Sequence, residues 1–191
     1  SASETVVFAV TLLEDDPLFN AGIGSQIQRD GKIRMSASLM DSATQKFSGV
    51  INIQNVKNPV LVAKALMKED DRVLGDTGAK QYAEQHGFED FSTEISQRRS
   101  EYEAKVKSEG KGTVGCVALD RDGKLAAATS TGGKGFELPG RISDSATVAG
   151  NFANSFCAVS CTGVGEDIVS NGTAAKIVTR VTDGLSVQHA F

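Results

Sequence analysis

The chain has 191 residues, of which 40% are hydrophobic and 23% are charged, and its formal net charge is −4. This length allows one large domain or two small ones of ordinary globular composition. The acidic balance, the absence of tryptophan and the lack of a basic stripe argue against a nucleic-acid partner, and without 18 consecutive apolar residues no membrane span is expected.

The first half of the sequence predicts a helix, a hairpin and two more helices. Residues 1–13 carry an apolar stripe at helical spacing, and the Pro- and Gly-marked stretch that follows predicts a loop. Apolar and polar residues alternate over 33–40 and again over 47–53, which predicts two strands joined across the SATQ loop. Helices are expected over 59–70, with Pro59 in the first turn, and over 77–87, ending at Gly87.

The second half predicts strands followed by helices. Residues 88–112 are rich in charge and poor in aliphatic side chains, so we expect a solvated, mobile connector with some helical character. Strands are expected over 113–120 and 124–133, joined by the turn Asp120-Arg121-Asp122-Gly123. Two short strands, one long helix over 166–184 and a last helical turn follow. Helices outside stacked antiparallel sheets account best for this order.

The cysteines and histidines give little support for metal or redox chemistry. Three cysteines (Cys116, Cys157 and Cys161) cannot all pair, and neither a CxxC motif nor more than two histidines is present. Buried free thiols are the simplest interpretation. They fit a reducing compartment, and since no secretory signal is recognisable, a cytoplasmic location is expected. His86 and His189 are interpreted as surface residues.

The junction between Gly112 and Thr113 raises a chemical possibility. A hydroxyl is a weak nucleophile without a base beside it, but the α-amine of an N-terminal threonine can serve as that base. Such an amine titrates near pH 7.7–8.0 in model peptides. Forming it requires a cut before Thr113, where Gly112 has no Cβ to block approach of the hydroxyl to its carbonyl. Taken alone, the dipeptide equally fits a strand that begins with a β-branched residue.

Four stretches supply further motifs: LLEDDPLFNAGIGS (12–25), SASLMD (36–41), GTVGCVALDRDGKLAAATSTGGKGFELPGRISDS (112–145) and CAVSCTGVGE (157–166). In this order they resemble the plant-type asparaginase and isoaspartyl peptidase family of N-terminal-nucleophile hydrolases. The resemblance implies an α/β (α+β) fold, a four-layer αββα sandwich with stacked antiparallel sheets. It also implies one intertwined domain with residues 1–112 as the α-subunit portion, 88–112 being its mobile connector, and 113–191 as the β-subunit portion.

The resemblance implies roles for individual residues. Thr113 corresponds to the nucleophile, with autocleavage between Gly112 and Thr113. Thr131 would orient it, although alone it fits a polar residue at a strand end. The other implied site residues are Asn20 near the nucleophile, Thr162 and Gly163 as oxyanion donors, Arg141 and Asp144 as a clamp for the substrate's α-carboxylate and α-ammonium, and Gly163 and Gly165 lining the substrate site. Arg141 and Asp144 equally fit an ordinary surface salt bridge.

The loop of residues 13–23 resembles one that wraps a sodium ion with backbone carbonyls. The candidate donors are Leu13, Glu14, Asp16, Phe19, Ala21 and Ile23. Hard cations prefer such oxygen ligands. Otherwise, the acidic run Glu14-Asp15-Asp16 is a solvated helix terminus. No cofactor is expected for the chemistry itself.

The expected activity is hydrolysis of L-asparagine and β-aspartyl (isoaspartyl) dipeptides by a homodimer of αβ protomers. Alternatives are a non-enzymatic or uncleaved precursor that acts as a binding module, and a glycosylasparaginase-like specificity. The family's early His-Gly-Gly strand and its last strand pair are not among the 191 residues, so we expect the fold to be truncated at both ends.

Overall fold

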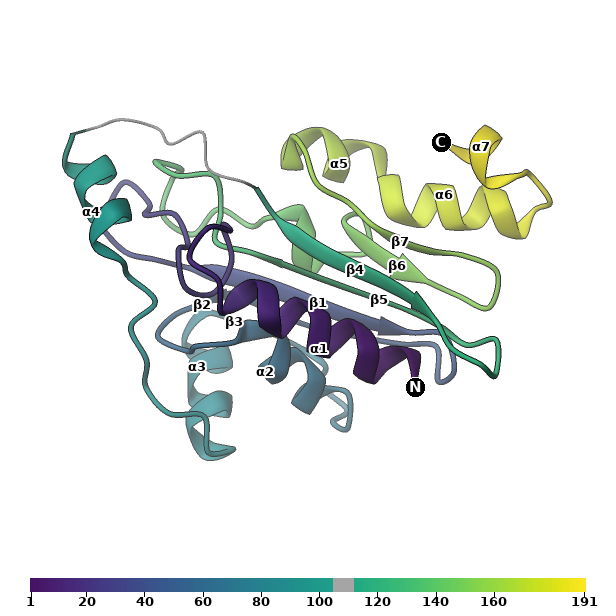
Figure 1. Ribbon diagram of the computed structural model, residues 1–191, viewed down its shortest axis with the longest axis horizontal. Helices are drawn as coiled ribbons and strands as arrows, with labels where there is room; N and C mark the ends of the chain where they lie inside the picture. The colour runs from purple at the N-terminus through teal and green to yellow at the C-terminus, as the bar shows by residue number, and fades with distance from the viewer. Residues whose placement is uncertain (105–111) are drawn as a thin grey trace.

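The computed structural model, which describes residues 1–104 and 112–191, has four layers: helices, a five-stranded sheet, a two-stranded sheet, and helices (Figure 1). This confirms the predicted αββα architecture. The elements are α1 Ala2–Glu14, β1 Met35–Asp41, β2 Lys46–Ile53, α2 Pro59–Leu66, β3 Val73–Gly75, α3 Asp76–Gln85, α4 Ser96–Glu103, β4 Val114–Leu119, β5 Leu125–Thr131, the 3-10 helix η1 Asp144–Ala146, β6 Asn151–Ala153, β7 Ala158–Ser160, α5 Gly165–Asn171, α6 Thr173–Thr182 and α7 Val187–Ala190. None of the helices described is long and apolar enough to cross a bilayer.

The large sheet has the strand order β3-β2-β1-β5-β4. Both predicted hairpins are present: β1 pairs with β2, and β4 pairs with β5, in each case antiparallel. The short edge strand β3 was not predicted, and it runs parallel to β2 after the α2 crossover. The sheet is therefore mixed, rather than wholly antiparallel as expected.

The centre of this sheet is covered on both faces. α1 and α2 pack on one face, and the β6–β7 sheet packs on the other. Although apolar and polar residues alternate along β1, neither face of the strand is exposed to solvent, since every residue from Met35 to Met40 is buried. Polar side chains on these strands find partners inside: Ser38 Oγ donates to Ser145 O at 2.5 Å, and Asn151 Nδ2 donates to Ser38 Oγ at 2.9 Å.

The C-terminal helices differ from the single long helix that was predicted. Gly172 adopts a left-handed conformation, with φ of +57°, and separates α5 from α6. A left-handed residue cannot continue an α-helix, and glycine adopts this conformation without strain. Ile177 and Val178 of α6 then pack with Cys157 beneath the small sheet.

Part of the predicted connector lies against the body of the protein. Within it, α4 carries Arg98, which is buried and donates from Nε to Gly24 O at 2.8 Å. Arg98 itself is therefore not solvated, because a long charged side chain can dock by its stem and reach a backbone acceptor. The other residues of α4 are exposed or partly exposed, as expected for a charged connector. Residues 105–111 of the predicted connector lie outside the described residues. The subunit boundary at Gly112 stays a prediction.

Candidate active site

The β4–β5 hairpin brings Thr113 and Thr131 together. Its register pairs Val114 with Ser130, so Thr113, just before β4, lies opposite the last residue of β5. Thr113 Oγ1 donates to Thr131 Oγ1 at 3.1 Å. Thr131 Oγ1 also accepts from the N–H of Gly133 at 3.3 Å. The Thr131 hydroxyl is thus held in place and can orient the Thr113 hydroxyl.

Asn20 lies behind this threonine pair. It is 5% exposed, and its Nδ2 donates to the carbonyl of Gly133. Its Oδ1 accepts from Gln26 N at 3.0 Å, and its carbonyl accepts from Gly132 N at 2.8 Å. These contacts fix the turn after β5, so the structure ties Asn20 to the neighbourhood of Thr131.

A cleft of about 270 Å³ opens in front of the threonine pair. It is lined by Thr113, Thr131, Gly133, Lys134, Arg141, Ser143, Asp144, Gly163, Val164, Gly165 and Glu166. Thr162 lies just outside this set and lines a larger adjoining hollow with Thr113. A Cβ added at Gly112 would lie 3.5 Å from Thr162 Oγ1, so the Thr162 hydroxyl stands beside the predicted cleavage junction.

Gly165 separates the two charged residues of the predicted clamp. A Cβ at this position would lie 2.5 Å from Arg141 Nη2 and 2.7 Å from Asp144 Oδ1. Both side chains therefore approach the backbone of Gly165 closely, which only glycine permits. The described residues contain no direct Arg141–Asp144 ion pair, so the alternative of a surface salt bridge between them is wrong.

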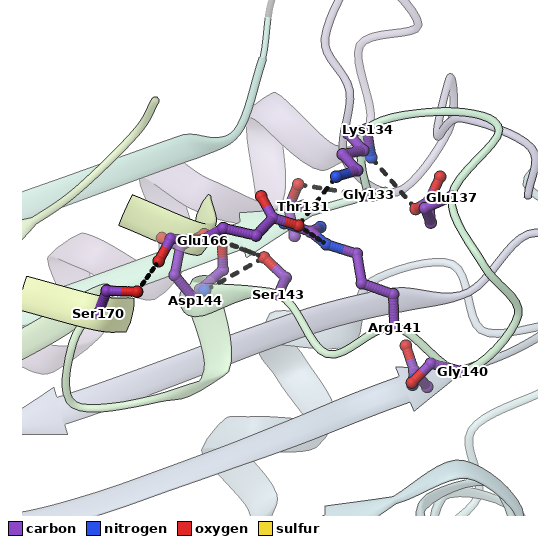
Figure 2. Close-up of polar contacts among 12 residues, drawn as sticks. Thr131, Gly133, Lys134, Glu137, Gly140, Arg141, Ser143, Asp144, Glu166 and Ser170 are labelled. Carbon is purple, nitrogen blue, oxygen red and sulfur yellow. Dashed lines mark hydrogen bonds and ion pairs between the residues drawn. The ribbon is translucent and has the colours of Figure 1, made fainter. Parts of the chain in front are cut away.

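The Arg141 guanidinium is held instead by Glu166, a residue that the sequence analysis did not single out. Glu166 Oε1 accepts from Arg141 Nε at 3.0 Å and from Lys134 Nζ at 2.8 Å. Figure 2 shows the Glu166 carboxylate reaching both cations. Hydrogen bonds from Lys134 and Arg141 lower the pKa of Glu166 to about 2. Lys134 was not singled out either. The signal that could have found Lys134 and Glu166 is that both are charged residues inside the motifs at 112–145 and 157–166.

Asp144 has a different environment. It is 4% exposed, its Oδ1 accepts from the Ser143 hydroxyl at 3.3 Å, and its Oδ2 has no hydrogen-bond partner among the described residues. Burial raises the pKa of Asp144, against the hydrogen bond from Ser143 and the positive charge of Arg141. A buried carboxylate oxygen without a partner, in a cleft, suits a cationic ligand group.

The loop predicted to hold sodium turns tightly around Glu14. The carbonyl of Glu14 accepts from Ile23 N at 2.8 Å, and that of Asp16 accepts from Phe19 N at 3.1 Å. The solvated-terminus alternative is wrong for Glu14, which is fully buried and caps α2, because its Oε1 accepts from Val60 N at 3.0 Å and from Ser130 Oγ at 2.6 Å. No group of three or more His, Cys, Asp or Glu side chains in residues 1–104 and 112–191 could hold a metal ion.

Fold and site together define a four-layer α/β protein with a threonine pair at the head of a charged cleft. The family described as Asparaginase matches residues 1–109 and 91–191. The chain is 50% identical over 211 residues to the isoaspartyl peptidase/L-asparaginase of Nostoc sp. strain PCC 7120, 42% over 214 to the isoaspartyl peptidase of Escherichia coli K12, and 36% over 215 to the plant-type L-asparaginase of Pyrococcus furiosus.

Each alignment covers all of this chain and 66%, 66% and 70% of the respective relative. The chain therefore belongs to the asparaginase family, and it spans about two thirds of the length of these curated relatives.

Proposed function

We propose that this chain is the core of a self-cleaving amidohydrolase that acts on L-asparagine and β-aspartyl dipeptides. The observation that carries the proposal is the 3.1 Å hydrogen bond from Thr113 Oγ1 to Thr131 Oγ1 at the head of the cleft, directly after Gly112. Relatives with names that include isoaspartyl peptidase and L-asparaginase support the substrate class.

Activation begins with the Thr113 hydroxyl attacking the carbonyl carbon of Gly112. The peptide C–N bond breaks as an ester to Oγ1 forms, and the nitrogen leaves as the free α-amine of Thr113. Water then hydrolyses the ester, which gives Gly112 a carboxylate and regenerates the hydroxyl. The freed amine belongs to the same residue as the nucleophilic hydroxyl and can accept its proton.

Turnover repeats this acyl chemistry on the substrate. Arg141 binds the α-carboxylate, and Asp144 binds the α-ammonium, so the side-chain carbonyl is presented to Thr113. Attack on that carbonyl releases ammonia or an amine and leaves a β-aspartyl ester, which water converts to aspartate. Thr162 and the N–H of Gly163 are the proposed donors to the developing oxyanion. One such donor typically contributes about 2.7–4 kcal/mol in the transition state.

The activity is tested by incubating the full-length protein with asparagine and with β-Asp-Leu and measuring ammonia, leucine and aspartate. Release of aspartate from either substrate by the wild type, and its loss in Thr113→Ala, is the expected result. A precursor that stays uncleaved and hydrolyses neither substrate would favour the binding-module alternative. Preferential hydrolysis of glycosylasparagine would favour a glycosylasparaginase-like specificity.

We further propose that the loop of residues 13–23 binds a structural Na⁺ through backbone carbonyls. In support, the carbonyls of Pro17 and Phe19 both face Gly24, where a Cβ would meet them at 2.5 and 2.8 Å. Each carbonyl oxygen has two lone pairs, so those of Glu14 and Asp16 can accept an N–H and still bind a cation. A higher melting temperature in sodium chloride than in choline chloride of equal ionic strength is expected, and equal values would contradict the site.

We also propose an oligomeric state and a cellular location for the protein. We expect a homodimer of αβ protomers, which light scattering on a sizing column would detect as twice the protomer mass. The free cysteines at all three positions support a reducing, cytoplasmic environment. Fractionation of cells that express the full-length protein tests this location.

A further inference from the structure

The turn after β5 has an unusual backbone. Gly133 and Gly135 have φ values of +86° and +76°, and Phe136 has a φ of +56°. A non-glycine residue in the left-handed region is strained and persists only where its surroundings hold it. What holds Phe136 therefore decides the shape of the loop of residues 133–141, called here the substrate loop.

The first support is an extended segment from the N-terminal half. The N–H of Phe136 donates to Ile27 O at 3.0 Å, and Arg29 Nε donates to Phe136 O at 2.7 Å. The N–H of Arg29 also donates to Glu137 O at 3.2 Å. Both backbone groups of Phe136 are thus bonded to residues 27–29.

The second support is α4. The Tyr102 ring stacks on the Phe136 ring, with centroids 5.5 Å apart and planes 10° from parallel, and its hydroxyl donates to Arg29 O at 3.0 Å. The helix itself is anchored nearby, because Arg98 Nε bonds Gly24 O at 2.8 Å and Arg99 Nη2 bonds Gly31 O at 3.3 Å. Tyr102 therefore touches both Phe136 and the segment that holds it.

The other side of the substrate loop faces the cleft. Lys134 and Arg141 both reach Glu166 there, and the N–H of Lys134 donates to Glu137 Oε1 at 3.1 Å. In contrast, Thr131 belongs to β5, and the turn that follows it is bonded to Asn20. A shift of Phe136 should hence move Lys134 and the proposed substrate-binding residue Arg141 more than the threonine pair.

We propose that α4 is a positioning element for the substrate loop, with Tyr102 as the positioning residue that acts through Phe136. This inference rests on the proposed function, since the loop carries Arg141. Because α4 precedes Gly112, autocleavage would place α4 and the substrate loop on different chains. α4 would then be held only by its non-covalent contacts and would support a loop of the other chain.

The test compares Tyr102→Ala, Tyr102→Leu and Tyr102→Phe with the wild type and with Gln97→Ala. Gln97 is an exposed residue of the same helix, and its Nε2 donates to Glu101 Oε1 at 3.0 Å. We expect KM for asparagine and β-Asp-Leu to rise about three- to tenfold in the Ala and Leu variants, as loss of an aromatic stack suggests. Both kcat and the rate of cleavage before Thr113 should stay within about twofold. Tyr102→Phe keeps the stack and should restore most of the wild-type KM.

Hydrogen exchange gives a readout that needs no activity. Peptides covering residues 133–141 should exchange faster in Tyr102→Ala and Tyr102→Leu than in the wild type, Tyr102→Phe or Gln97→Ala. Unchanged exchange, or a KM equal to that of the wild type in both apolar variants, would overturn the proposal. So would an equal loss of kcat and cleavage rate. If the wild type hydrolyses neither substrate, the proposed function fails, while the exchange result still decides whether Tyr102 holds the loop.

Discussion

Replacing Gly165 by alanine is expected to disable substrate binding while leaving autocleavage intact. The added Cβ would lie 2.5 Å from Arg141 Nη2 and 2.7 Å from Asp144 Oδ1, both far inside normal contact. Gly165 has no left-handed φ, so the backbone itself accepts alanine, and the effect comes from the new methyl group. Arg141 has a long side chain that can swing away, whereas Asp144 is buried and has less room to move.

The size of the effect follows from the bonds that the displaced groups would lose. A hydrogen bond to a charged group contributes about 1.5–3 kcal/mol, and about 1.4 kcal/mol corresponds to a tenfold change. Loss of one clamp contact therefore predicts a fall of about 10- to 150-fold in kcat/KM, expressed mainly as a higher KM. Steady-state kinetics with asparagine and β-Asp-Leu measures this, and electrophoresis follows cleavage before Thr113.

A matched substitution is available in α3. Gly78→Ala introduces the same methyl group at a helical position where a Cβ would meet nothing within 4 Å. It should leave the kinetics unchanged and raise the free energy of unfolding by about 0.5–1 kcal/mol. A Gly165→Ala enzyme with wild-type KM would refute the assignment of Arg141 and Asp144 to the substrate. Loss of cleavage in that variant would show that Gly165 acts on the nucleophile instead.

Three further results are expected. Thr131→Val should slow both cleavage before Thr113 and turnover by about ten- to hundredfold, since it removes the hydroxyl that accepts from Thr113. Thr131→Ser keeps a hydroxyl and should recover most of the rate. Equal rates in Thr131→Val and the wild type would contradict the orienting role of Thr131. Protonation of the Thr113 amine sets the first fall of kcat/KM as pH is lowered, and Asp144 should add a second fall. Because burial raises the pKa of Asp144, this second fall should lie above the usual aspartate range, since Asp144 gains a proton early and loses its attraction for the substrate ammonium; a second fall near pH 3.9 would argue against this. Burial also raises the pKa of Glu14 from its usual 4.5 to about 8, so the folded state binds the proton more tightly than the unfolded state; this stabilisation is complete below about pH 4.5 and is lost as pH rises through about 8. Glu14→Gln keeps an acceptor for Val60 and Ser130. In urea unfolding between pH 5 and 8, the free energy of unfolding of the wild type should fall as pH rises, and that of Glu14→Gln should fall much less. An equal fall in both proteins would place the origin of the pH dependence elsewhere.

The sequence was sufficient for features that depend on local chemistry. Alternating residues and turn signals predicted both hairpins, and the Asp120–Gly123 turn is present, with a Gly123 φ of +71°. Pro59 begins α2 and Gly87 follows α3, as their backbone preferences require. Once both strands and their turn are assigned, the hairpin register places Thr113 opposite Thr131.

Features that depend on distant packing could not be predicted in this way. The burial of Glu14 depends on Val60 and Ser130, which are far from it in sequence. The break at Gly172 was missed because apolar residues continue at helical spacing on both sides, and pattern alone does not show φ. The docking of α4 was missed because its charged composition is typical of solvent-exposed segments, whereas its contacts are made by Arg98 and Tyr102 individually.

Mass spectrometry of the purified full-length protein under denaturing conditions tests the central claim most directly. The account predicts that incubation converts the precursor into two chains, the smaller of which begins at Thr113, and that Thr113→Ala remains whole. An uncut precursor that nevertheless hydrolyses β-Asp-Leu, or a new chain that begins at any other residue, would contradict the assignment of Thr113 as the nucleophile.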